Sequence, residues 1–207
     1  MSVNFMQSKT KENLMRSFAG ESQAKNRYKF AADEAKQQNM YFIEQIFKQT
    51  AHQEEQHAKI FWDLLKEANG QKITVDGDYP VENVTDLIVL LKDAQKNEYE
   101  ECNWVYPEFQ RIAEEEGFPA IAAKYKQVSQ IERTHGDRFG TFAVLMEQNK
   151  LFTSDTETEW FCFNCGNIHK GTSAPKQCPF CAKPQGYFVP FKYYKFLAEN
   201  YATGNQV

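Results

Sequence analysis

Two glutamates in this chain are each followed three residues later by a histidine. Glu54 and His57 form the first pair, and Glu132 and His135 form the second. Residues three apart lie on the same face of a helix, so each pair presents a carboxylate beside an imidazole. Carboxylate and imidazole ligands together suit iron or manganese better than magnesium or calcium. The two pairs therefore predict two halves of one metal site.

Both pairs lie in the middle of an apolar stripe rather than on a charged face. Alternating steps of four and three residues lead from Ile43 through the first pair to Leu64, and from Ile121 through the second pair to Met146. The other positions that these steps reach are mostly aliphatic or aromatic. A stripe of this kind is the face that a helix buries in a bundle.

The two other helical stretches also carry acids in their apolar stripes. The first stretch has Glu21, and the third has Glu98 and Glu101. With the two acids of the Glu-x-x-His pairs, five carboxylates face inward, and each desolvated charge costs roughly several kcal/mol. Two bound cations would offset that charge. Ferritin-like di-iron bundles use one Glu from each of two helices and Glu-x-x-His from each of the other two, and this chain has one acid more.

Turn-forming residues divide residues 1–149 into four long helical stretches. Breaks near residues 38–39, across 69–80 and at 117–119 predict a four-helix bundle. A ferritin-like bundle needs a long connection between its second and third helices. Twelve extended residues reach about 40 Å, roughly the length of a 27-residue helix. Because the connection is only just long enough, the sequence also allows an arrangement in which two subunits exchange helix pairs.

The C-terminal part has a different composition. The polar run TSDTETE predicts a linker over residues 150–159, followed by a small domain rich in cysteine, glycine and proline over residues 160–190. The aromatic residues of this domain, Phe180 among them, are expected to build its core. Residues 191–207 form a tail with room for a short amphipathic helix, and its role is unknown.

Four of the five cysteines form two Cys-x-x-Cys knuckles. Cys162 and Cys165 make the first, and Cys178 and Cys181 make the second. This spacing predicts a tetrahedral four-sulfur metal site. Spacing alone leaves open a zinc ribbon that only supports the fold. A di-iron site in the same chain must be re-reduced by single electrons, and this favours iron in the four-cysteine site. The fifth cysteine, Cys102, is predicted to be a helix-face residue and not a ligand.

Composition and charge exclude several classes of function. The chain has 207 residues, a net charge of -4 and 42% hydrophobic residues, with no apolar run long enough to span a membrane. Acidic and basic residues are interspersed without a basic stripe, which argues against nucleic acid as a partner. The polar N-terminal sequence lacks the apolar region of a signal peptide, so we expect a cytoplasmic protein.

Four segments, in order, resemble rubrerythrin. They read FAGESQAKNRY, HQEEQHAKIF, NEYEECNWVYPEFQRIAEEEG and WFCFNCGNIHKGTSAPKQCPFC, so the resemblance covers nearly the whole chain. It implies an all-α, ferritin-like four-helix bundle followed by a small rubredoxin-like domain with short β-strands. One departure is Ala182, which stands where free rubredoxins have glycine.

The resemblance also implies roles for the inward-facing side chains. The implied di-iron ligands are all carboxylates or imidazoles: Glu21, Glu54, His57, Glu98, Glu101, Glu132 and His135. Among them, Glu54 and Glu132 would bridge the two irons, and Glu101 and His57 would replace one another at one iron as its redox state changes. The four cysteines would hold a third iron, with zinc as the alternative occupant.

Two tyrosines, Tyr28 and Tyr106, match residues of the family that donate hydrogen bonds to the ligating carboxylates. Either could equally be an ordinary aromatic residue of the bundle core. The sequence does not decide between these two interpretations.

The activity that the resemblance implies is reduction of hydrogen peroxide to water in defence against oxidative stress. Electrons would come from rubredoxin or an NAD(P)H-dependent reductase and pass through the four-cysteine iron, between the subunits of a head-to-tail homodimer. Ferroxidase activity with iron storage and an oxygen-activating di-iron oxidase are the alternatives. A non-enzymatic zinc-ribbon adaptor would leave the inward-facing acids unexplained.

Overall fold

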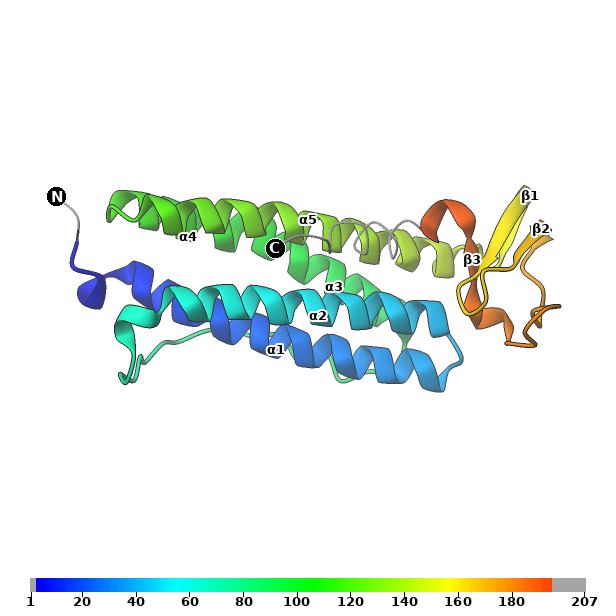
Figure 1. Cartoon of the computed structure of the whole chain (residues 1–207), viewed down its shortest axis with the longest axis horizontal. Helices are drawn as coiled ribbons and strands as arrows, with labels where there is room; N and C mark the ends of the chain where they lie inside the picture. Colours follow the sequence, from blue (N-terminus) through cyan, green and yellow to red (C-terminus); the bar gives the residue numbers. More distant parts are fainter. Residues whose placement is uncertain (1–2, 195–207) are drawn as a thin grey trace. The chain divides into compact units, whose positions relative to one another are not determined.

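Long helices make up most of the chain, and a small sheet follows them (Figure 1). The computed structural model describes residues 3–194. The helical elements and strands are, in order, α1 Lys9–Gln37, α2 Tyr41–Leu64, α3 Leu87–Glu100, α4 Tyr106–Glu115, α5 Pro119–Glu147, β1 Thr153–Cys162, β2 Ile168–Ser173 and β3 Phe188–Pro190. None of the helices in the described part combines the length and apolar character needed to cross a membrane.

Residues in the left-handed region end three of the helices. Asn39 (φ 61°), Gly117 (φ 86°) and Asn149 (φ 55°) follow α1, α4 and α5. At the first of them, the backbone N–H of Met40 returns to the carbonyl of Ala35 at 2.9 Å, which closes the helix end. The breaks predicted near residues 38–39 and 117–119 are confirmed.

A π-helical segment, Glu101–Val105, joins α3 to α4 without a break. The wider turn advances the helix face by one position, so Cys102 and Tyr106 are buried and Val105 is only half-buried. The hydroxyl of Ser129 donates to the carbonyl of Cys102 at 2.8 Å, which gives a carbonyl in the widened turn a partner. A constant helical repeat predicts that Val105 faces inward, and this prediction is therefore wrong.

The connection between α2 and α3 is longer than the expected 69–80. It runs from residue 65 to 86 and contains a short 3-10 turn, Lys66–Ala68. Helix α3 begins only where the side chain of Asp86 accepts the backbone N–H of Ile88 at 2.8 Å and of Val89 at 3.2 Å. The length of this connection therefore gives no reason for helix exchange between subunits.

The segment expected to be a linker, residues 150–159, is largely the first half of a strand. β1 is the middle strand of an antiparallel sheet with the order β2-β1-β3. Trp160 pairs with His169 of β2, and Phe161 pairs with Val189 of β3. Threonine and aromatic residues favour strands, and β2 pairs with the acidic half of β1 as well.

The core of the small sheet contains fewer aromatic side chains than expected. Trp160 and Phe188 are fully buried with Cys162 and Cys178. Phe180 is 79% exposed, so its assignment to this core was wrong. The tail begins with a helical turn at residues 191–194, and the remainder of the expected amphipathic helix lies outside the described residues.

The described residues pack as two compact units. The first takes in residues up to 28, 50–83 and 93–137. Its core includes Phe61 and Tyr125, whose ring centroids are 5.5 Å apart.

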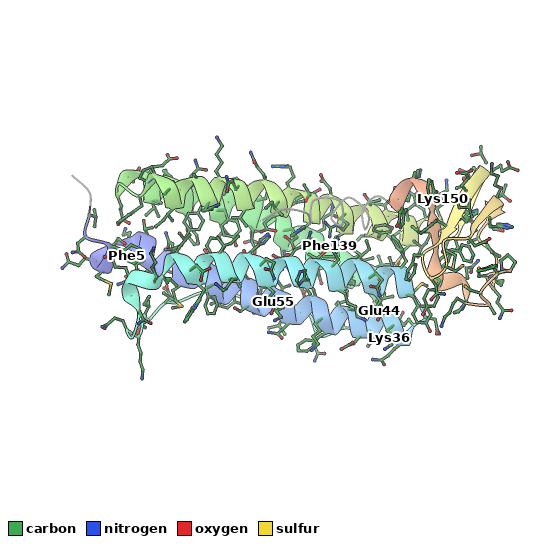
Figure 2. The ribbon with its side chains drawn as sticks, in the orientation of Figure 1. Phe5, Lys36, Glu44, Glu55, Phe139 and Lys150 are labelled. Carbon is green, nitrogen blue, oxygen red and sulfur yellow. The ribbon has the colours of Figure 1, made fainter. Side chains whose placement is uncertain are left out.

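The second unit takes in residues 29–49, 84–92 and everything described from 138 onward. Phe47 packs against Phe139, which is fully buried, at 5.2 Å between ring centroids (Figure 2). The sheet belongs to this unit as well, and Tyr41 at the start of α2 stacks on Tyr187 at 4.3 Å.

Candidate metal centres

Six buried carboxylate and imidazole side chains meet within the first unit. Their possible ligand atoms form two groups in which all atoms lie within 4.8 Å of one another. The first group is Glu21, Glu54, His57 and Glu132; the second is Glu54, Glu98, Glu132 and His135. Two of the acids are common to both groups, as two ions that share bridging carboxylates would require.

The two shared carboxylates extend from one imidazole to the other. Nδ1 of His57 lies 3.0 Å from one oxygen of Glu54 and 3.0 Å from one oxygen of Glu132. Nδ1 of His135 lies 2.9 Å and 2.8 Å from the other oxygen of each. Each carboxylate thus presents one oxygen to each half of the site.

Several of these close approaches lack the geometry of a hydrogen bond. Both oxygens of Glu132, both ring nitrogens of His135 and one oxygen each of Glu21, Glu54 and Glu98 are buried without a hydrogen-bond partner among the described residues. Buried polar atoms are normally paired, and each exception needs an explanation. Oxygen and nitrogen donors in this number and at this spacing fit a pair of iron ions.

Protons on the carboxyl and imidazole groups of the site can balance its charge. Burial, with added repulsion from neighbouring carboxylates, raises the pKa of Glu21 and Glu101, and it raises the pKa of Glu98 to about 8. Burial opposes the charged form of His57 and His135, but the adjacent carboxylates still raise the pKa of both imidazoles. Bound cations would take the place of these protons.

The seventh predicted ligand, Glu101, is not in either group. It is half-buried and is the first residue of the π-helical segment. The structure therefore brings together six of the seven predicted residues. Of the two residues expected to replace one another at one iron, His57 is grouped with Glu21 and Glu101 is not. Segments of π-helix occur frequently at functional sites.

Both candidate tyrosines donate to carboxylates of the site. The hydroxyl of Tyr28 donates to Glu98, and the hydroxyl of Tyr106 donates to Glu21. Burial and the adjacent carboxylate raise the pKa of both phenols, so both keep their proton. Hydrogen bonds of this kind orient metal ligands, and each of the two unshared carboxylates has one.

A close approach beside His135 was not expected from the sequence. A Cβ atom on Gly136 would lie 2.6 Å from the ring of Tyr99, so only glycine lets α3 come this near to α5. The hydroxyl of Tyr99 donates to Asp137 at 2.6 Å. A glycine directly after a candidate ligand in the middle of a helix was the available signal.

The other histidines and the fifth cysteine lie where the sequence indicated no ligand role. His52 is exposed, and His169 is half-buried on β2. Cys102 is buried, with its sulfur 3.3 Å from the side-chain oxygen of Asn103. No group of potential ligands in the described part of the chain includes these three residues.

The four knuckle cysteines come together at the end of the sheet. The sulfur atoms of Cys162 and Cys181 are 3.8 Å apart, and those of Cys165 and Cys178 are 3.7 Å apart. A tetrahedron with metal–sulfur bonds of about 2.3 Å has edges of about 3.8 Å. The thiols therefore fit a single tetrahedral ion, and this geometry suits iron and zinc alike.

The two knuckles have the same backbone turn. Gly166 (φ 78°) and Ala182 (φ 58°) each follow the second cysteine of a knuckle. Their backbone N–H groups donate to the carbonyl of the first cysteine, at 2.8 Å for Gly166 and 2.9 Å for Ala182. The left-handed conformation suits glycine and strains alanine, so the second knuckle is the strained one.

Comparison with known proteins shows the family. The family model described as rubrerythrin matches residues 12–143, which contain both halves of the di-metal site. The chain belongs to the rubrerythrin family. A second model, described as the rubredoxin-like domain of rubrerythrin, matches residues 160–189 and so contains all four knuckle cysteines. Members of this family are di-iron proteins that carry a rubredoxin-like domain.

Curated relatives match over nearly their whole length. Rubrerythrin from Clostridium perfringens is 42% identical, covering 89% of this chain and 95% of its own. Rubrerythrin from Porphyromonas gingivalis is 38% identical, covering 93% and 94%. Among solved structures, the fully reduced, all-ferrous state of nigerythrin is 26% identical with a TM-score of 0.60, covering 92% of this chain and 94% of that one. The ferritin-like bundle with a rubredoxin-like domain is thereby established.

Proposed function

We propose that this chain is a peroxidase that reduces hydrogen peroxide to water in defence against oxidative stress. The observation that carries the proposal is the pair of ligand groups that share Glu54 and Glu132, in the same chain as a four-sulfur site. Two adjacent metal positions suit a two-electron reaction, and a four-sulfur iron suits the return of electrons one at a time. The rubrerythrin family consists generally of oxidoreductases, which agrees with this reading.

The balance of the reaction fits that composition. One hydrogen peroxide takes up two electrons and two protons, its O–O bond breaks, and two waters form. When bound, a pair of ferrous ions supplies the two electrons and Lewis acidity, and the four-cysteine iron supplies single electrons. The protein has to hold the ligands, limit the access of water and provide protons.

The chain's own residues meet these demands in a defined way. Glu54 and Glu132 fix the spacing of the two halves of the site. Tyr28 and Tyr106 hold the unshared carboxylates of Glu98 and Glu21 in one orientation. Tyr106 also lines a cavity, and its hydroxyl holds a proton beside Glu21.

The electron donor in this proposal is rubredoxin or an NAD(P)H-dependent reductase, and the working form is a cytoplasmic homodimer. In this dimer the four knuckle cysteines of one subunit would hold the iron that supplies single electrons to the di-iron site of its partner. The exposed ring of Phe180, between Cys178 and Cys181, offers an apolar contact beside the sulfur site for a donor. The long connection between α2 and α3 is compatible with a homodimer whose subunits keep their own helices.

An anaerobic mixing experiment tests the peroxidase. The iron-loaded protein is reduced and mixed separately with hydrogen peroxide and with dioxygen, and the di-iron and four-cysteine absorptions are followed. We expect peroxide to oxidise the di-iron site faster than dioxygen does, with oxidation of the four-cysteine iron afterwards. Dioxygen reacting as fast as peroxide would instead indicate a ferroxidase or an oxygen-activating oxidase.

The variant Cys165→Ser separates the two sites. It should lose the four-cysteine absorption, keep the first oxidation phase and lose the second. Zinc in the four-cysteine site of protein produced anaerobically would remove the internal relay, because zinc does not change its oxidation state.

A further inference from the structure

A cavity of about 640 Å³ lies beside the di-metal site, within the first unit. Its walls include Glu101 and Tyr106, and Tyr106 donates to the candidate ligand Glu21. Other parts of the wall come from the connection between α2 and α3, including Tyr79. A molecule in this cavity therefore contacts Glu101, the hydrogen-bond partner of Glu21 (Tyr106) and the connecting segment.

Residues 76–82 of the connection, here called the strap, are held at each end by an arginine of α1. Arg16 contacts Asp76 twice, from Nη2 to the carboxylate at 2.7 Å and from Nε to the backbone carbonyl at 3.1 Å. Arg27 contacts Glu82 at 2.8 Å. The strap is thus fixed to the helix that carries Glu21.

The two attachments differ in strength. The side chain of Asp76 is 93% exposed, and an ion pair in water contributes little. The side chains of Arg27 and Glu82 are only 12% and 9% exposed, and Asn97 of α3 also donates to Glu82. Breaking a buried ion pair leaves an uncompensated charge and is strongly destabilising. Because Glu82 accepts from both Arg27 and Asn97, the Glu82 end is the fixed end of the strap.

Tyr79 lies between these two attachments and packs against glycines. A Cβ atom on Gly20 of α1 would meet its ring at 3.9 Å, and one on Gly77 would lie 2.9 Å from its Cζ and hydroxyl oxygen. The hydroxyl lies 3.4 Å from the carbonyl of Arg16. The ring is therefore held over α1 at Gly20, the residue before Glu21, mainly by packing, and Tyr79 is 42% exposed.

We propose that the strap is a size filter for the di-metal site, and that the ring of Tyr79 determines the largest molecule that reaches it through the cavity. The filter deepens the proposed peroxidase function and rests on it for the nature of the substrate. Hydrogen peroxide is small enough to pass the ring, whereas a bulky alkyl hydroperoxide requires the ring to move. Tyr79 acts by its volume and does not touch the reacting atoms.

The variants Tyr79→Ala and Tyr79→Phe separate volume from hydrogen bonding. Alanine removes the ring, and phenylalanine keeps it while losing the contact with the carbonyl of Arg16. Phe30→Ala serves as a control, because Phe30 is an exposed aromatic residue of α1 that does not line the cavity. If Tyr79→Ala fails to fold, Gly77→Ala replaces it, since the added Cβ forces the ring to shift.

The first readout does not depend on catalysis. A bulky, membrane-impermeant phenanthroline sulfonate is added to the reduced, iron-loaded protein under anaerobic conditions, and the rate of ferrous iron withdrawal is measured while the four-cysteine absorption is monitored. We expect Tyr79→Ala to lose its di-iron faster than the wild type, with Tyr79→Phe and Phe30→Ala unchanged. An unchanged rate in a folded Tyr79→Ala protein would overturn the filter.

The second readout is the ratio of kcat/KM for cumene hydroperoxide to that for hydrogen peroxide. Tyr79→Ala should raise this ratio by about tenfold or more, a discrimination typical of a change in pocket size. An equal rise in Tyr79→Phe, or no rise in Tyr79→Ala, contradicts the filter. If the wild type reduces no hydroperoxide, the peroxidase proposal fails, and the chelator rates alone decide whether the filter exists.

Discussion

The imidazole rings of His57 and His135 lie nearly parallel, with 5.7 Å between their centroids and 16° between their planes. Glu54 and Glu132 each place one oxygen within about 3 Å of Nδ1 of His57 and the other oxygen within about 3 Å of Nδ1 of His135. The two halves of the site are thus related by the acids that they share. Removing a shared acid and removing an unshared acid should have different results.

The variant Glu54→Gln should lose both irons of the di-iron site, and Glu21→Gln should weaken the binding of only one iron. Glu54 belongs to both ligand groups, whereas Glu21 belongs to one. Loss of a ligand should exceed the roughly 100-fold loss of affinity found for the partners that support ligands. Iron per chain is measured after anaerobic loading, with the four-cysteine absorption as an internal standard.

The matched control for these variants is Glu55→Gln. Glu55 is the next residue of α2, but it is exposed and pairs with Lys25 at 2.6 Å (Figure 2). Its iron content should equal that of the wild type. Retention of both irons in Glu54→Gln would show that the shared acids do not bridge.

The variants Tyr106→Phe and Tyr28→Phe test the hydrogen bonds to the unshared carboxylates. Each removes one donor from a buried carboxylate and leaves the ring in place. We expect a loss of about 10- to 100-fold in iron affinity or peroxide reactivity. Tyr99→Phe is the control, because its hydroxyl donates to Asp137 outside the ligand groups. Equal effects in all three variants would mean that only packing is disturbed.

Helical periodicity was sufficient to predict most of the di-metal site. Six of its residues come together because a regular repeat on each helix fixes which side chains face inward. It was insufficient after Glu101, where the π-helical turn adds a residue to the repeat and buries Tyr106 in place of Val105. The inserted residue shifts the buried positions by one, and a constant helical repeat does not allow for that shift.

The C-terminal part shows a different limit. The polar run before Trp160 has the composition of a linker, yet it forms a strand because β2 pairs with it. Strand formation depends on a distant partner more than on local composition. The four cysteines were predictable because their spacing alone defines the two knuckles.

The variant Ala182→Gly should stabilise the four-cysteine domain by about 1 kcal/mol, because alanine at φ 58° is strained and glycine is not. Gly166→Ala is the reciprocal change at φ 78°, with no atom within 4 Å of the new Cβ outside its chain neighbours, so it should destabilise the domain through the backbone alone. The midpoint of thermal loss of the four-cysteine absorption measures both. A lower midpoint for Ala182→Gly would contradict the assignment of strain.

Glu116 should stabilise the bundle in a pH-dependent way. Its carboxylate accepts the backbone N–H of Lys9 at 2.9 Å and both the backbone N–H and hydroxyl of Thr10, at 2.8 Å and 2.6 Å, at the start of α1. Burial acts to raise its pKa, but these hydrogen bonds lower it overall. A carboxylate at a helix N-terminus contributes about 1 kcal/mol.

A lowered pKa in the folded state fixes the sign of the pH dependence. The contribution of Glu116 is complete above the pKa of the unfolded chain, near 4.3 for an ordinary Glu, and it is lost as the pH falls through the folded value. Glu116→Gln should therefore be less stable than the wild type at neutral pH, and the difference should shrink in acid. Urea unfolding of both proteins at matched pH cancels the titration of all other groups. Glu114→Gln, at an exposed position two residues earlier, should show no such difference. If the difference in unfolding free energy between the wild type and Glu116→Gln stayed constant into acid, the carboxylate would be ruled out as its source.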